Sequence, residues 1–354
     1  MEIGSIYDID IKDLFKERKK EVLFPFEKNT KYKNKKFFNT GRSAIEYLLK
    51  YQLDFKPNDI ILVPNFTCSS IIEAIERAKI KYIYYNISSS FNIDMKDLKN
   101  KLCDNVKAIF FINYFGSTQS KEIIEELVKL KEKYIIIEDN TQALFTSDEN
   151  KIGIGDYIVA SIRKWLPIPD GAILCSEHTI KDESIDNGYN EYMVKYILAQ
   201  LMKNEYLKYG KQNKEKYLEL VKQSIDSLFS DYTIRKMTDI SLKLMENQNF
   251  EDIAKKRKEN YKFLYENLEE IEPIEIPFKP NIKIVPFGFV ILTKYRDELN
   301  KYCIENDVYC NIHWKGCANE LSDRIITIPC DQRYTKKDME YIADLLKSFF
   351  RRKK

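Results

Sequence analysis

The chain has 354 residues, of which 44% are hydrophobic, and its 58 basic residues nearly balance its 55 acidic ones, giving a net charge of +3. This length is enough for one large domain or two modest ones. A near-neutral charge, with no stripe of Lys and Arg interleaved with aromatic residues, argues against a protein that binds nucleic acid.

The seven cysteines include no Cys-x-x-Cys pair, and the only histidines are His178 and His313. The odd cysteine count indicates free thiols in a reducing compartment, and two histidines are too few for a His-rich metal site. The sequence begins with polar and acidic residues and contains no apolar run of about 18 residues. We therefore expect a cytoplasmic protein with no membrane segment and no metal.

Residues 1–35 are mostly polar and are expected to form an N-terminal arm. Beyond them, short apolar runs alternate with stretches of helical spacing. Strands are expected at 60–63, 81–85, 108–112, 134–137, 157–161 and 172–175, and helices at 43–51, 69–78 and 121–131. This alternation predicts an α/β fold, with a mainly parallel sheet covered by helices on both faces.

The second half of the chain changes character twice. Residues 180–268 have helical spacing without a clean heptad, so we expect helices there, with a helical insertion at about 180–230. After the Pro-containing stretch 272–277, strands are expected at 289–292, 309–312 and 325–328, and helices at 296–305 and 336–350. We therefore predict a large α/β domain over residues 36–268 and a small C-terminal α+β domain over residues 269–354.

Two of the predicted strands end near side chains that a single type of enzyme active site would use together. Asp139 ends the run that starts at Ile135, and Lys164 follows the strand at 157–161. In parallel sheets, ligands lie outside the carboxyl ends of the strands. An acid and a lysine there suit a pyridoxal 5′-phosphate (PLP) enzyme, because the acid keeps the pyridine nitrogen protonated and the lysine forms a Schiff base. The alternatives are an acid that caps the next helix and a solvated surface lysine.

Two segments combine small or hydroxyl residues with the start of a predicted helix. In Thr40-Gly-Arg-Ser-Ala44, a glycine lets the backbone approach a ligand, and the helix N-terminus offers free N–H groups to a phosphate. The alternative is an ordinary N-cap by Ser43. Capping is also the alternative for the hydroxyl groups that follow the strand in the segment 63–70.

The order of several motifs along the chain resembles the DegT/DnrJ/EryC1/StrS family, which are fold-type-I PLP-dependent sugar aminotransferases. The motifs are Gly41-Arg-Ser-Ala-Ile45, Val63-Pro-Asn-Phe-Thr67, Asn113-Tyr-Phe-Gly116, Glu138-Asp-Asn-Thr-Gln-Ala143 and Ser161-Ile-Arg-Lys164. The segment 323–335, with the helix expected after it, is similar to the C-terminal signature of that family. The resemblance runs from about residue 39 to 350 and implies a sheet of the seven-stranded type.

The resemblance also implies roles for single residues. Lys164 would carry the cofactor and move protons, Asp139 would pair with the pyridine N1–H⁺, and Gln142 would hydrogen-bond O3′. The other cofactor-binding residues that it implies, mostly around the phosphate, are Ser161, Thr67 and the backbone N–H groups of Arg42 and Ser43. Arg163 either adds charge at the phosphate or forms a structural salt bridge, and the sequence leaves both readings open.

The sequence departs from the family pattern at the residue after Thr67. Family members often place there an aromatic ring that stacks on the cofactor, whereas this chain has Cys68. Phe66 and Tyr114 are the candidate substitutes, and Tyr114 is also a candidate substrate contact. His313 either touches the substrate or the cofactor phosphate, or is packed at a strand end.

The function expected from these residues is the transfer of an amino group, with glutamate as donor, to a keto-sugar nucleotide for surface-polysaccharide synthesis. The alternatives are amination of a small non-nucleotide ketone and a non-catalytic homologue that binds a nucleotide sugar. The resemblance further implies a homodimer, because the active sites of the family lie at a subunit interface.

Overall fold

In the computed structural model, the described residues are 2–18, 23–28, 32–148, 151–210 and 214–353. Their centre is a seven-stranded sheet with the order β2-β8-β7-β6-β5-β3-β4. The strands are β2 (Asn34–Phe38), β3 (Ile60–Pro64), β4 (Lys81–Tyr85), β5 (Val106–Ile112), β6 (Ile135–Asp139), β7 (Tyr157–Ser161) and β8 (Ala172–Ser176). The run from β4 to β7 is parallel, whereas β8 is antiparallel to both β7 and β2.

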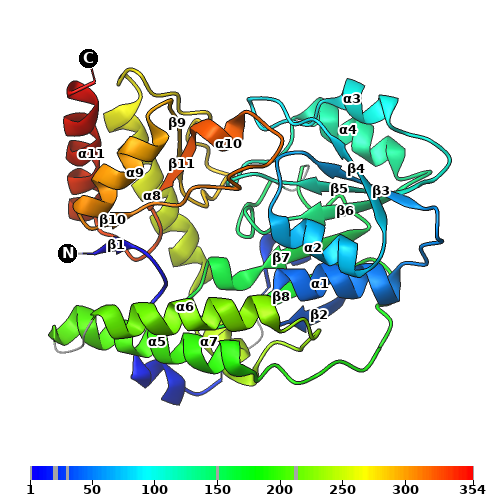
Figure 1. Ribbon diagram of the computed structural model, residues 1–354, viewed down its shortest axis with the longest axis horizontal. Helices are drawn as coiled ribbons and strands as arrows, with labels where there is room; N and C mark the ends of the chain where they lie inside the picture. The colour runs from blue at the N-terminus through cyan, green and yellow to red at the C-terminus, as the bar shows by residue number, and fades with distance from the viewer. Residues whose placement is uncertain (1, 19–22, 29–31, 149–150, 211–213, 354) are drawn as a thin grey trace.

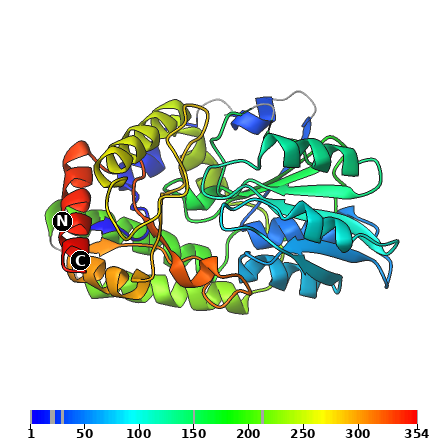
Figure 2. The same cartoon turned by 90° about the horizontal axis from the view of Figure 1, so that it is seen from above.

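The central strands are buried on both faces, which is why they appear in the sequence as continuous apolar runs. Helices cover both faces of the sheet (Figures 1 and 2). They are α1 (Gly41–Tyr47), α2 (Ser69–Arg77), α3 (Met95–Asn100) and α4 (Lys121–Leu130), and a π turn over Leu48–Gln52 extends α1. In α4 the apolar side chains of Ile123, Ile124 and Leu127 recur at helical spacing and are buried, and Ser120 caps the helix.

The helical region is shorter than the sequence predicts. Its helices are α5 (Glu191–Tyr209), α6 (Lys214–Ser230), α7 (Asp239–Glu246) and α8 (Phe250–Leu268), so the expectation of helix at 180–190 is wrong. Asn190 starts α5 because its side chain accepts a hydrogen bond from the backbone N–H of Met193. The chain before it is extended and bridges Arg235 through Asp186, and the segment 231–238 is likewise not helical.

The C-terminal part packs at the opposite end of the molecule from the sheet (Figure 1). Its strands β9 (Phe289–Leu292) and β11 (Ile325–Ile328) pair antiparallel, and its helices are α9 (Arg296–Glu305), α10 (Leu321–Arg324) and α11 (Lys336–Arg351). The strand expected at 309–312 is present only as β10 (Val308–Tyr309), followed by an isolated bridge from Asn311 to Thr327.

The N-terminal segment does not stay apart from the rest of the chain. Its strand β1 (Ile3–Gly4) pairs in parallel with β10, and two 3₁₀ turns follow at Ile11–Phe15 and Pro25–Lys28. Residues 1, 19–22 and 29–31 of the predicted arm lie outside the described residues. The division into domains at residues 35 and 268 stays a prediction. Within the described residues, no helix combines the length and the apolar character that crossing a membrane requires.

The last two residues of β6 point to opposite sides, because side chains alternate along a strand. Glu138 is fully buried, and its carboxylate accepts hydrogen bonds from the backbone N–H groups of Gly153 (2.9 Å), Ile154 (2.7 Å) and Gly155 (3.0 Å). It also accepts one from the Asn113 side chain at 3.0 Å. Glu138 therefore fixes the loop that leads into β7, while Asp139 faces the other way.

We expect Glu138→Gln to lower the free energy of unfolding by about 3 kcal/mol, because its amide group cannot accept the N–H bonds that the lost oxygen accepted. Urea unfolding of the purified protein measures this change. The matched control is Glu132→Gln on the surface, which should stay within about 0.5 kcal/mol of wild type. Equal unfolding midpoints for the two variants would contradict the anchoring role of Glu138.

Candidate active site

A cavity lies at the carboxyl ends of β6 and β7 and is lined by residues from five further segments of the chain. It brings together six of the residues predicted from the sequence, namely Arg42, Asp139, Gln142, Ser161, Arg163 and Lys164. The remaining lining residues come from α1, the start of α2, the end of β5, the end of α6 and the loop at Trp314. Because β6 and β7 are parallel neighbours, their carboxyl ends necessarily meet at this edge.

Asp139 presents a carboxylate with spare hydrogen-bonding capacity. One oxygen accepts a hydrogen bond from the backbone N–H of Thr141 at 2.7 Å. The side chain is 5% exposed, and burial raises its pKa above the ordinary value, while the nearby charge of Lys164 partly opposes this rise. A cationic N–H donor at the cavity would stabilise the charged form.

Gln142 is oriented by the backbone. Its side-chain oxygen accepts a hydrogen bond from the N–H of Phe115 at 3.1 Å. Because that oxygen is engaged, the amide nitrogen is the end that can donate to a ligand in the cavity.

The start of α1 forms another wall of the cavity. Thr40, not Ser43, is the N-cap, and its hydroxyl oxygen accepts from the N–H of Ser43 at 3.1 Å. The Ser43 N–H thus already has an acceptor in the fold, and its expected contact with a phosphate stays a prediction. The N–H groups of Gly41 and Arg42, in the first turn, have no acceptor within the helix. The Arg42 guanidinium is held by Glu73 at 2.8 Å and by the carbonyl of Leu228.

Arg163 and Lys164 lie in a 3₁₀ turn over Ile162–Lys164, directly after β7. Among the described residues, neither side chain has an ion-pair partner within 4.0 Å or a hydrogen bond, and Lys164 is exposed at the cavity. The sequence left two interpretations of Arg163 open, a phosphate contact and a structural salt bridge. Among the described residues, Arg163 forms no such salt bridge. Arg163 and Lys164 interact with Asp170 and Asp139 only at longer range, so two cations without a close ion pair among the described residues make this part of the cavity suited to an anion.

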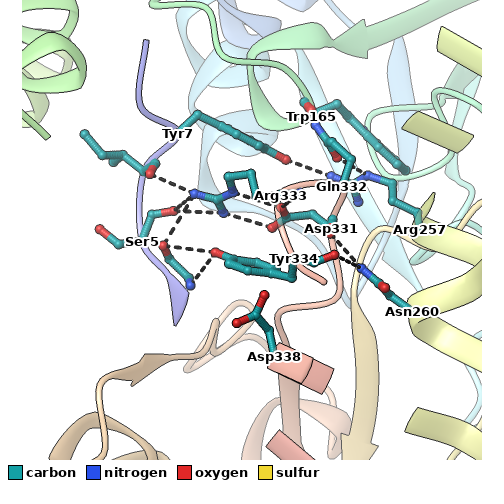
Figure 3. Close-up of polar contacts among 12 residues, drawn as sticks. Ser5, Tyr7, Trp165, Arg257, Asn260, Asp331, Gln332, Arg333, Tyr334 and Asp338 are labelled. Atoms are coloured by element: carbon teal, nitrogen blue, oxygen red, sulfur yellow. Dashed lines mark hydrogen bonds and ion pairs between the residues drawn. The ribbon is translucent and has the colours of Figure 1, made fainter. Parts of the chain in front are cut away.

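Trp165, the residue after Lys164, makes polar and cation–π contacts with three other residues, of which Figure 3 labels Gln332 and Arg257. The indole N–H of Trp165 donates to the carbonyl of Thr141 at 2.7 Å, and its own carbonyl accepts from Gln332 at 2.8 Å. Arg257 lies 4.3 Å from the centre of the Trp165 ring and also donates to the Gln332 side-chain oxygen at 2.7 Å. A further N–H of Arg257 donates to the Tyr7 hydroxyl of the N-terminal arm at 2.7 Å.

Three predicted residues lie behind the cavity wall instead of lining it. Tyr114 is buried and donates its hydroxyl to the carbonyl of Phe66 at 2.6 Å, so this group is used within the fold. The Thr67 hydroxyl is buried without a partner in the described part of the chain. His313 likewise has no partner for Nε2, and burial together with the charge of Lys164 lowers its pKa to about 3, so the ring is neutral.

Residues 26–162 match the model of the DegT/DnrJ/EryC1/StrS aminotransferase family. That segment includes the motifs at 41–45, 63–67, 113–116 and 138–143. The match to this family therefore covers the part of the chain from the N-terminal arm to the start of the turn that carries Lys164. The aminotransferase class predicted from the sequence is confirmed at the level of the family, and no curated protein matches the chain.

Solved structures of this class have the same fold along nearly the whole chain. A protein from Streptococcus pneumoniae assigned as a sugar aminotransferase, in its PLP-form, matches with a TM-score of 0.70 and 15% identity, covering 99% of each chain. A Helicobacter pylori aminotransferase involved in the biosynthesis of pseudoaminic acid matches with a TM-score of 0.67 and 15% identity, covering 99% of this chain and 100% of its own. A Brucella abortus aminotransferase of the same family matches with a TM-score of 0.63 and 16% identity, covering 92% and 89%. The predicted α/β, fold-type-I architecture is confirmed.

We expect Gln332→Ala to lower the free energy of unfolding by about 2 kcal/mol. The substitution leaves the buried Arg257 Nε–H and the Trp165 carbonyl without partners. Thermal and urea unfolding measure the loss. Gln223→Ala, which removes only an exposed contact to Glu219 on α6, is the control and should be near neutral. Equal free energies of unfolding for the two variants would show that the contacts of Gln332 with Trp165 and Arg257 do not stabilise the fold.

Proposed function

We propose that this protein transfers an amino group from glutamate to a keto-sugar nucleotide and so makes a building block for a surface polysaccharide. The observation that carries the proposal is the placement of Asp139, Gln142, Arg163 and Lys164 around one cavity, in a chain with the aminotransferase family match. The Helicobacter pylori neighbour is involved in the biosynthesis of pseudoaminic acid, and the Streptococcus pneumoniae neighbour is assigned as a sugar aminotransferase, which supports a sugar as the acceptor.

The cofactor of this enzyme class is PLP, and the residues of the cavity fit the PLP ring. The Asp139 carboxylate, which Thr141 alone hydrogen-bonds among the described residues, keeps acceptor capacity for the protonated pyridine nitrogen, a cationic donor that would stabilise this buried acid. Gln142 has its amide nitrogen available for the phenolic oxygen. The acceptor of Asp139 and the donor of Gln142 thus complement the ring nitrogen and the phenolic oxygen of PLP.

The phosphate of PLP also finds complementary groups. Arg163 offers a guanidinium with no ion pair among the described residues, and Ser161 adds a hydroxyl at the end of β7. The first-turn N–H groups of Gly41 and Arg42 point the positive end of α1 at the same cavity. A dianion here would neutralise the excess positive charge that the described lining residues leave.

When bound, PLP draws electrons from the carbon that bears the amino group and carries that group from donor to acceptor. The Nζ of Lys164, exposed at the cavity, would move the proton from the α-carbon of the donor to carbon C4′ of the cofactor, and in the opposite direction once the acceptor is bound. Asp139 keeps the proton on the ring nitrogen, and the contacts of Trp165 with Thr141 and Gln332 limit the positions that the lysine backbone can adopt.

The test begins with uptake of PLP. We expect wild-type protein to form an absorbing complex with PLP and, after borohydride reduction, to carry a pyridoxyl group on Lys164. Lys164→Ala should lose the adduct and at least about 100-fold in glutamate-dependent amination of keto-sugar nucleotides. The surface variant Lys181→Ala should keep both properties. Wild-type protein that takes up no PLP would contradict the proposal, and turnover of small ketones alone would move it to the non-nucleotide alternative.

We further infer that the protein acts as a homodimer. The helices α5 and α6 pack side by side (Figure 1) and carry exposed apolar side chains. Val194 and Leu198 are four residues apart on α5, and Leu218, Ile225 and Phe229 recur at helical spacing on α6, so each set shares one face of its helix. They are between 40% and 48% exposed, and a second copy that covered them would shield them from water. It would also close the cavity, because Phe229 lines it.

Sedimentation velocity checks the oligomeric state. We expect a dimer for wild type and a shift to monomer for Leu198→Glu, because a charge in an apolar interface is not solvated. Lys222→Glu, an exposed change on α6, should remain dimeric. A monomeric wild type would rule out this interface.

A further inference from the structure

One wall of the cavity has no ring at the position where the family pattern places one. Cys68 lies there as the N-cap residue of α2, and its thiol is 3.5 Å from the hydroxyl of Ser70. A flat cofactor ring that Asp139 and Gln142 hold by its edges leaves both faces to be covered by other groups. Aromatic side chains suit such faces because their dispersion and quadrupole terms favour stacking.

The two rings expected to substitute for the missing one do not reach the cavity. Phe66 is fully buried and Tyr114 is 1% exposed, and neither is among the lining residues. They lie one layer deeper, with their ring centres 5.6 Å apart and joined by the hydrogen bond from the Tyr114 hydroxyl to the Phe66 carbonyl.

Trp314 lies in front of these two rings and does line the cavity. Its ring centre is 4.7 Å from that of Phe66 and 5.9 Å from that of Tyr114, so the deeper rings support it from behind. The ring of His313, the neighbour of Trp314, has its centre 4.9 Å from that of Phe115, and the Phe115 N–H donates to the Gln142 side chain. Trp314 is therefore on the side of the cavity that holds Gln142.

The other aromatic residue among the described lining residues is at the opposite end. Phe229, at the end of α6, has its ring centre 5.7 Å from the guanidinium carbon of Arg42. That position is beside the start of α1, where the anion is expected. Phe229 is thus a neighbour of the phosphate and not of the ring.

The backbone at Trp314 has an unusual conformation. Its φ of +52° lies in the left-handed region, which costs a bulky residue about 1–2 kcal/mol. The turn is closed by a hydrogen bond from the N–H of Cys317 to the Trp314 carbonyl at 3.2 Å. A glycine would adopt this conformation without the cost, so the presence of tryptophan points to a use for its side chain.

We propose that Trp314, from the C-terminal part of the chain, covers one face of the PLP ring and takes the place left open at Cys68. This inference rests on the proposed function, since it requires PLP in the cavity. It makes Trp314 a cofactor-binding residue that the sequence pattern does not indicate. It also predicts that the small Cys68 and the large Trp314 compensate for each other, because both line the same cavity.

The experiment measures the affinity of the apoprotein for PLP, by equilibrium dialysis and by the absorbance of the bound cofactor, without any turnover. Trp314→Ala should weaken binding about tenfold, Trp314→Leu should weaken it similarly although it keeps apolar volume, and Trp314→Phe should stay within about threefold of wild type. Adding Cys68→Phe to Trp314→Ala should restore most of the affinity, because the ring then comes from the other position. The melting temperature of each apoprotein controls for folding.

Each outcome separates this inference from the proposed function. Tight PLP binding by wild type and by both Trp314→Leu and Trp314→Ala would overturn the stacking role and leave the proposed function intact. Loss of affinity that Cys68→Phe does not restore would also overturn it, because Trp314 would then act only through the structure of its loop. If wild type itself takes up no PLP, both proposals fall together.

Discussion

The cavity depends on how the carboxyl end of β6 is fixed. Glu138 turns away from the cavity into a buried set of backbone N–H groups, and this forces its neighbour Asp139 toward the ligand side. The same carboxylate holds the loop at 153–155, from which β7 starts in register with β6. Asp139 is paired with Val159 in that register. Glu138 thus determines the position both of Asp139, which faces the ligand side, and of the turn that carries Lys164.

Around this fixed edge, the site is assembled from segments that are far apart in the sequence. The lysine turn is braced by Trp165, which contacts Gln332 and Arg257 from the C-terminal half. One wall of the cavity is formed by α1 and by the end of α6, and another by the loop at Trp314. The sheet therefore provides the polar groups, whereas the C-terminal part provides the supports and the aromatic wall.

The sequence was most informative where function and local pattern coincide. Strand-end positions predicted that Asp139, Gln142, Ser161 and Lys164 would share one edge, because buried strands are recognisable as apolar runs. The sequence was least informative where a contact joins residues that are far apart along the chain. Nothing local marks Gln332 as a partner of Trp165, since the two are joined only by the tertiary fold.

Two further differences between the predicted and the observed structure have local causes that the spacing of apolar residues does not reveal. The apolar spacing at 180–190 resembles that of the helices after it, but the helix starts only where Asn190 caps it and the preceding chain bridges to Arg235. The left-handed turn at Trp314 likewise has no residue-type signal, because glycine and asparagine are the usual markers of that conformation.

The pairing of β1 with β10 has a consequence for how the protein is made. The N–H of Gly4 donates to the Tyr334 hydroxyl across 330 residues of sequence, and Tyr7 bonds Arg257, which braces the residue beside Lys164. Such contacts close very long loops, whose entropic cost is met late in folding. During synthesis, the sheet can form first. The N-terminal segment with β1 is made earliest, but it cannot pair with β10 until the C-terminal part of the chain has been made. The braced lysine is thus a property of the finished polypeptide, and a nascent chain lacks it.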